Sequence, residues 1–329
     1  MQRLMRDSSK TEAERPVQLE FRKSWLLPGA ILALSVLLFR DELRRLPNRV
    51  EIGERTVQLQ FEPVELASGS VGPFRIVGAW RLLAEDSRFG GISALAVNGD
   101  EFIAISDSAV VARFPKPGKK DPRITLRELP GGPGRPGFKV NRDSEALLAD
   151  PNGRGWWVAF ENRDELWLYD RRLSRALKRF KLDASELGRN RGVEGMVADG
   201  EQLLLFPERG GRALHLDPAA TLPINGISGW LSDAVRLPNG RILVVNRRPT
   251  PIGLSNSLVL LERDGGGYRA RRHWRIPVGR LDNVEALAAE PLAGGGTRLW
   301  MMTDNNLQQR RPTLLLALEF RPRPARQPS

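Results

Sequence analysis

The stretch that decides the fold reads DNVEALAAEP (282–291), RLWMMTDNNLQQRRP (298–312) and TLLLALEF (313–320). Its first segment carries Glu285 inside the apolar run Val284–Ala289, and its second contains the acidic turn Asp304-Asn305-Asn306. The third run, residues 313–320, is almost entirely apolar. Short apolar runs bounded by turn residues are typical of buried β-strands.

The same order of elements recurs four times upstream. The copies start near residues 93, 145, 194, 233 and 285, at intervals of 52, 49, 39 and 52 residues. In four copies a turn signal separates the first two runs: Asn98-Gly99-Asp100, Pro151-Asn152-Gly153, Asp199-Gly200 and Pro238-Asn239-Gly240. Repeats of this length, made of short strands without helices between them, predict a β-propeller.

We therefore expect an all-β propeller of five or six blades over residues 50–320. Residues 50–66 alternate apolar and polar side chains, as half-buried strands do. These early strands could pair with residues 313–320, which would close the ring and remove its free edges. A β-sandwich is the alternative, although sandwiches rarely show a repeat of this length.

The N-terminal region has a different composition. Residues 1–23 are polar and predict a disordered cytoplasmic tail, while residues 24–39 (SWLLPGAILALSVLLF) carry no charge. We expect residues 24–39 to form a signal anchor or uncleaved signal segment, with a cleaved leader or a buried globular helix as alternatives. Residues 40–49 read as a stalk and 321–329 as a disordered tail.

The basic residues around the apolar segment indicate its orientation. Six precede it and four follow within ten residues, beside two acids. This bias favours a cytoplasmic N-terminus and an exported propeller on the periplasmic or extracellular face. The propeller would be anchored to the inner membrane, or secreted if the leader is cut.

Composition excludes several kinds of chemistry. The chain has no cysteine and two histidines, His215 and His273, which rules out thiolate catalysis and Cys-based zinc sites and disfavours a multi-histidine metal site. Neither a Gly-x-Ser-x-Gly elbow nor a phosphate-binding P-loop is present. The net charge of +12 could attract anions, but the charges are interspersed, so we expect no nucleic-acid partner.

The repeats also resemble a known family. The resemblance rests on five segments in order: GGISALAV (90–97) with AISD (104–107), RDSEALLADPNGRGWWVAFENRDELWLYD (142–170), RGVEGMVADGEQLLLFPE (191–208), LSDAVRLPNGRILVVNRR (231–248), and DNVEALA with TLLLALEF (282–320). These segments are similar to phytase-like ("esterase-like activity of phytase") β-propeller domains. The resemblance implies an exported propeller whose centre is lined by acidic residues, with calcium-dependent phytases as the analogy.

The chain departs from the family pattern at several places. Ala146 and Ala286 stand where the family usually has glycine, and Asp107-Ser108-Ala109 replaces Asp-Arg-Gly. Asn246 stands where an acid commonly precedes the Arg-Arg pair, which removes one negative ligand.

The first strand of each blade lines the centre of a propeller, so equivalent residues converge there. Glu145, Glu194 and Glu285 occupy equivalent positions, with Ser93 and Asp233 as the corresponding or near-corresponding residues of the other copies. Converging carboxylates must share protons, pair with arginine or bind a cation. We expect these three glutamates to be catalytic.

Acids also recur where second strands end. The predicted metal ligands are Glu145, Glu194, Glu285, Asp304 and Asp107. Oxygen donors without histidine or cysteine favour Ca²⁺, with Mg²⁺ as the second choice, and no organic cofactor is expected. In a purely structural alternative, backbone N–H groups or Arg142 and Arg191 would neutralise the glutamates.

Basic residues near these motifs could receive an anionic small molecule: Lys139, Arg142, Arg191, Arg209 and Arg247. The expected function is that of a membrane-tethered, metal-assisted hydrolase of phosphate or other esters. The alternatives are a non-catalytic envelope propeller that binds or scaffolds other molecules, and a sugar-lactonase-like hydrolase that also depends on a metal.

Overall fold

A computed structural model describes residues 52–183, 192–216, 219–251, 253–279, 282–305 and 312–321. The chain divides into two compact units, Met1–Arg45 and Leu46–Ser329, and the description concerns the second. The predicted tail (1–23), anchor (24–39) and stalk (40–49) and the C-terminal residues 322–329 lie outside the described residues. Within the described part, no helix has the length and apolar character needed to cross a membrane.

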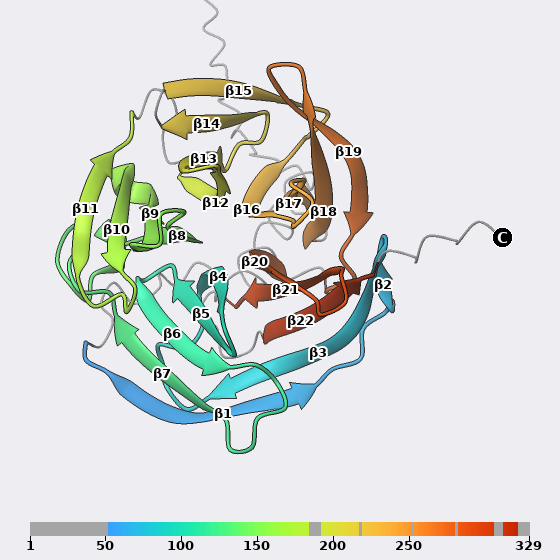
Figure 1. Cartoon of the computed structure of the whole chain (residues 1–329). Coiled ribbons are helices and arrows are strands. Elements are labelled where there is room, and N and C mark those ends of the chain that lie inside the picture. The colour runs from blue at the N-terminus through green and yellow to red at the C-terminus, as the bar shows by residue number, and fades with distance from the viewer. Residues whose placement is uncertain are drawn as a thin grey trace, which may run out of the picture. The chain divides into compact units, whose positions relative to one another are not determined.

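The described strands pair in three sheets, of ten, four and eight strands. They divide into five units of four antiparallel strands, called here blades, and the first strand of each blade in the order below is called its inner strand (Figure 1). β15 and β19, the last strands of blades 3 and 4, pair parallel and join those two blades. Blade 1 consists of β4 (Ile92–Asn98), β5 (Glu101–Ser106), β6 (Val110–Pro115) and β7 (Arg123–Glu128). Blade 2 consists of β8 (Ser144–Ala149), β9 (Gly155–Phe160), β10 (Glu165–Asp170) and β11 (Ala176–Lys181). Blade 3 consists of β12 (Val193–Asp199), β13 (Gln202–Pro207), β14 (Arg212–Leu216) and β15 (Ala219–Asn225).

The last two blades contain longer strands. Blade 4 consists of β16 (Trp230–Arg236), β17 (Ile242–Thr250), β18 (Gly253–Asp264) and β19 (Gly267–Arg275). Blade 5 consists of β20 (Asn283–Pro291), β21 (Thr297–Asp304), β22 (Thr313–Phe320) and the early strand β3 (Phe74–Ala84). The remaining elements are β1 (Arg55–Pro63), β2 (Ser70–Val71) and the 3₁₀ turns η2 (Lys139–Asn141) and η3 (Glu161–Arg163).

The inner strands form a closed ring. β4 packs beside β8, β8 beside β12, β12 beside β16, β16 beside β20, and β20 returns to β4. Residues from all five line one axial cavity of about 220 Å³. The described residues therefore form a five-bladed β-propeller, which confirms the propeller prediction, selects five blades rather than six and excludes the sandwich.

The ring closes between the two ends of the propeller sequence. β22 pairs antiparallel with β3, so that Leu316 lies opposite Ala79, as expected from the early strands. β1 then continues this closure, because it pairs with β3 through Leu59 and with β7 through Thr56. Pairing of this kind leaves fewer free edges where another chain could add a strand.

Apolar faces of neighbouring blades pack against each other. The core between blades 5 and 1 includes Leu82, Phe102, Trp300 and Leu315, all at most 3% exposed. Trp156, Trp157 and Trp300 are buried in these inter-blade cores.

Substitutions at two neighbouring leucines in β3 test whether this strand closes the ring of blades. Leu82 is 2% exposed in the core between blades 5 and 1, whereas Leu83 points outward and is 39% exposed. We expect Leu82→Ala to lower the free energy of unfolding by about 2–5 kcal/mol, because it leaves a cavity at the seam. Leu83→Ala should change it by about 0.5 kcal/mol or less. Urea unfolding measures both, and equal effects would mean that β3 does not close the core.

Candidate functional site

Every inner strand carries a β-bulge near its start. Its register with the second strand skips one residue, at Ser93, Glu145, Glu194, Ser232 and Glu285. A bulge leaves one residue out of the ladder and turns its side chain in a new direction. The register corrects one alignment: the blade 4 equivalent of the glutamates is Ser232, not Asp233.

The two bulge serines join neighbouring blades. Ser93 Oγ donates to the carbonyl of Ser144 at 2.5 Å, and Ser232 Oγ donates to the carbonyl of Val284 at 2.7 Å. In both cases the acceptor immediately precedes a bulge glutamate. The serines therefore help to hold the strands that carry Glu145 and Glu285.

Glu145 lies among other acids. Burial raises its pKa well above the ordinary value, and Glu194, Asp143 and Glu285 raise it further through charge repulsion. These interactions place all three bulge glutamates in one electrostatic cluster, as their equivalent positions in the repeats suggested. Glu145 therefore favours its protonated form, or a cation beside it.

Arg247 on β17 binds the other two bulge glutamates. Its guanidinium contacts Glu285 directly, reaches Asn283 Oδ1 at 3.0 Å and lies 3.6 Å from Glu194 Oε2. Burial alone would lower the pKa of Arg247, but Glu285 and Glu194 raise it above the ordinary value. Burial raises the pKa of both glutamates, and Arg247 opposes that rise.

Lys139 on η2 provides the second buried cation. Its Nζ lies 2.5 Å from Asp107 Oδ2 and 3.4 Å from Asp143 Oδ1. Burial would lower the pKa of Lys139, but Asp107 and Asp143 outweigh this and hold it above the ordinary value. Gly91 allows Asp107 to approach, because a Cβ there would lie 2.8 Å from Asp107 Oδ1.

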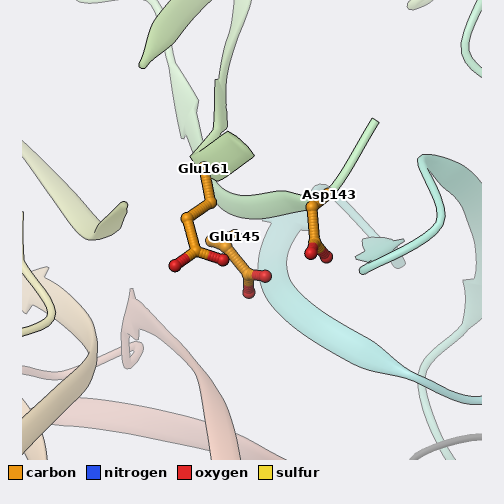
Figure 2. A group of neighbouring side chains, drawn as sticks. All are labelled: Asp143, Glu145 and Glu161. Atoms are coloured by element: carbon orange, nitrogen blue, oxygen red, sulfur yellow. The ribbon is translucent and has the colours of Figure 1, made fainter. Parts of the chain in front are cut away.

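Three carboxylates in blade 2 form the tightest acidic group. Asp143, Glu145 and Glu161 each offer an oxygen, and these oxygens all lie within 4.8 Å of one another (Figure 2). Asp143 directly precedes β8, and Glu161 begins η3 after β9, so the first hairpin of one blade supplies the group. Burial, followed by repulsion from Asp143, raises the pKa of Glu161.

We call Asp143, Glu145 and Glu161 the blade 2 carboxylates. The predicted metal ligands overlap with this group only in part. Glu145 was expected there, whereas Asp143 and Glu161 were not. Two features of the sequence could have revealed Asp143 and Glu161: the Asp-x-Glu spacing at 143–145, and the acid Glu161 directly after β9, the second strand of blade 2. Asp107 is instead held by Lys139, and Asp304 lies buried opposite Asn283 at the end of β21.

The predicted substrate-binding residues have different environments. Arg142 is fully buried and donates to the carbonyls of Leu129 and Gly131, 3.4 Å from Glu128. Its guanidinium therefore anchors the loop after β7. Lys139 and Arg247 lie beside the acids, and Arg209 is exposed after β13. Arg191 lies outside the described residues.

Acids outnumber cations in this part of the propeller. The described carboxylates of the cluster are Asp107, Asp143, Glu145, Glu161, Glu194, Glu208 and Glu285, and its buried cations are Lys139 and Arg247. Each cation is already shared by two carboxylates. The arrangement can therefore retain protons on its acids or hold an added cation through oxygen ligands.

Comparison with known families identifies the relationship. Residues 87–307 match the phytase-like family model, described as esterase-like activity of phytase. The match spans more than half of the 329 residues.

The chain belongs to the phytase-like family.

The search of curated proteins finds no match for this phytase-like chain. Three similar solved structures follow. The β-propeller domain of Myceliophteria thermophila Cps50 (Swd1) has 11% identity, a TM-score of 0.40, and coverage of 78% of this chain and 99% of that chain. A protein of Bacteroides uniformis assigned as a 6-phosphogluconolactonase has 15% identity, a TM-score of 0.39, and coverage of 75% and 74%.

The third structure is hydrazine synthase from Kuenenia stuttgartiensis, at 12% identity and a TM-score of 0.39. The match covers 70% of the phytase-like chain and 63% of that chain, which is less than two thirds of its length. Similarities this distant give no information about activity.

The buried carboxyl of Glu145 should make the metal-free phytase-like protein sensitive to pH. Its folded pKa lies above the ordinary value of 4.5, so above that pH the unfolded chain ionises first. Stability should therefore fall as pH rises from about 4.5 towards neutrality. We expect Glu145→Gln to be more stable than the wild type at pH 7.5, with the difference vanishing near pH 4.

Urea unfolding in EDTA between pH 4 and pH 8 measures this effect. Glu65→Gln is the matched control, because Glu65 is exposed and lies outside the cluster. A glutamine variant at 145 that is less stable than the wild type at pH 7.5 would contradict the assignment of Glu145 as a destabilising buried acid.

Proposed function

We propose that this phytase-like propeller is a metal-dependent hydrolase of phosphate or other esters. The observation that carries the proposal is the group of blade 2 carboxylates, Asp143, Glu145 and Glu161, whose oxygens lie within 4.8 Å of one another. The description of the family, esterase-like activity of phytase, supports the reaction class.

The blade 2 carboxylates suit a hard divalent cation. All three donors are oxygens, which favours Ca²⁺ and then Mg²⁺. Asp143 Oδ1 is buried and makes no hydrogen bond of good geometry with any described residue, although Lys139 Nζ lies 3.4 Å away. A bound cation would supply positive charge for an ester oxygen.

Arg247 binds the other two bulge glutamates, Glu194 and Glu285. Glu285 makes the closest contact with Arg247 and holds its guanidinium in place. Arg247 and Lys139 provide positive charge on two sides of the acids, where an anionic ester group could bind. These contacts favour Glu285 as a positioning residue rather than a metal ligand.

Glu194 is the best candidate for the general base. Burial raises its pKa well above the ordinary value despite the neighbouring Arg247. A carboxylate with a raised pKa accepts a proton from water more readily near neutral pH than an exposed one. We therefore assign Glu194 to water activation and Asp143, Glu145 and Glu161 to the cation.

Calcium titration and a panel of phosphate ester, carboxyl ester and lactone substrates test these assignments in the full chain. We expect Ca²⁺-dependent turnover of one substrate class. Glu194→Gln should lower kcat about 10²–10⁴-fold and still bind Ca²⁺. Asp143→Asn should weaken Ca²⁺ binding about tenfold or more, because it removes a charged ligand.

The outcomes separate the competing functions. The exposed Glu65→Gln variant should match the wild type in binding and turnover. Turnover of lactones alone would favour the sugar-lactonase-like alternative. A protein without calcium binding or turnover would contradict the hydrolase proposal and leave the scaffold propeller.

We also propose that the chain is exported and anchored through residues 24–39. The uncharged run and the basic residues that precede it support this placement. Membrane fractions should retain the full chain after a high-salt wash, and protease added outside the inner membrane should cut the propeller. Recovery in the cytoplasmic fraction would overturn the proposal.

A further inference from the structure

A second charged site lies at the other end of the propeller. A recess of about 800 Å³ between blades 1 and 2 reaches the β4–β5 turn, whereas the acidic cluster surrounds the starts of the inner strands. Its lining has three acids, Glu54, Asp100 and Glu101, and six basic residues, Arg113, Lys119, Arg123, Arg127, Arg171 and Arg172. We call this recess the arginine groove.

Strand pairing places arginines on one wall of the groove. On blade 1, Arg113 of β6 pairs with Thr125 of β7, and Val111 pairs with Arg127. Val111 still belongs to the buried core between blades 1 and 2. Further out, arginines line the recess, so the apolar packing between these blades gives way to positive charge.

Most of these guanidinium groups lack an acidic partner. Arg127 donates to the carbonyl of Arg172, Arg171 to that of Gly153 at 2.7 Å, and Arg123 to that of Thr56 at 3.4 Å. Across the described ranges, no carboxylate lies within ion-pair distance of these three arginines or Arg172. The remaining lining cations are neutralised: Arg113 by Glu101 at 2.7 Å and Lys119 by Asp100 at 3.9 Å.

Arginines on blade 4 provide the contrast. Arg263 lies 2.9 Å from Asp199, while Arg241 and Arg271 lie 3.5 Å and 3.4 Å from the two oxygens of Glu262. These three arginines of blade 4 are each paired with a carboxylate, whereas Arg272 and Arg275 on β19 have no ion pair among the described residues. Unlike these, Arg123, Arg127, Arg171 and Arg172 line one recess together.

The groove continues into an adjoining recess of about 630 Å³. Arg171 and Arg172 line both. The second recess adds Arg175, the acid Asp170, and Arg154, which is already paired with Asp150 at 2.8 Å. Guanidinium groups along a continuous hollow suit a ligand with several oxyanions in a row, since each group can bind one phosphate through two N–H donors. A flat bilayer would touch the rim of such a recess rather than its walls.

We propose that the arginine groove binds a soluble, linear phosphate-bearing polyanion, with Arg123, Arg127 and Arg171 as its main contacts. The groove is separate from the acidic cluster, so this inference does not depend on the proposed hydrolysis. Carboxylates at the inner-strand starts would repel the same ligand when no metal is bound, which directs it to the groove.

Isothermal titration of the full chain with inorganic tripolyphosphate, in EDTA and about 0.15 M salt, tests the proposal. The test variant is the triple Arg123→Gln, Arg127→Gln, Arg171→Gln. Its matched control is the triple Arg241→Gln, Arg263→Gln, Arg271→Gln, which removes the same charge from blade 4. We expect the first triple to bind about tenfold more weakly or worse, and the control to change by less than about twofold, because loss of charge-assisted hydrogen bonds affects only the groove.

Each other outcome overturns the proposal. Equal weakening in both triples would show attraction by net charge alone, and failure of the wild type to bind would remove the site. Binding to vesicles containing phosphatidylglycerol without binding to tripolyphosphate would assign the groove to lipid headgroups. Thermal unfolding checks that both triples fold; if the groove triple does not, Arg171→Gln alone, at an exposed turn, must weaken binding at least about threefold.

Discussion

Repulsion between buried carboxylates is the constraint on which the centre of this propeller depends. Bulges at the starts of the inner strands bring Glu145, Glu194 and Glu285 together where burial makes each charge costly. Arg247 offsets part of this cost, because its guanidinium contacts both Glu194 and Glu285. Lys139 does the same for Asp107 and Asp143.

The contacts of Arg247 determine which of the clustered carboxylates remain available to bind a metal ion. Because Arg247 already binds two of the bulge glutamates, the cluster is divided into an arginine-bound part and the blade 2 carboxylates. The blade 2 carboxylates come from a single hairpin and its flanking residues, since Asp143 precedes β8, Glu145 lies at its bulge and Glu161 begins η3.

The acidic cluster and the arginine groove differ in electrostatic character. Acids surround the starts of the inner strands, whereas arginines line the groove between blades 1 and 2. The net charge of +12 does not reveal this difference, because it sums over the whole chain. An anion is therefore attracted to the groove and, without a bound cation, repelled by the acidic cluster.

The sequence alone determined the propeller, its closing strand and the meeting of three glutamates, because these follow from repeated local patterns. Strand length, turn residues and equivalent positions such as Glu145 and Glu194 are all readable at short range. The hydrogen-bond and ion-pair partners of the side chains could not be predicted from the sequence, because they depend on strand register and on packing between distant segments. Only the tertiary structure decided that Arg142 binds carbonyls of the loop after β7 and that Ser232 rather than Asp233 lies at the bulge. It also decided that Asp143 and Glu161 lie beside Glu145.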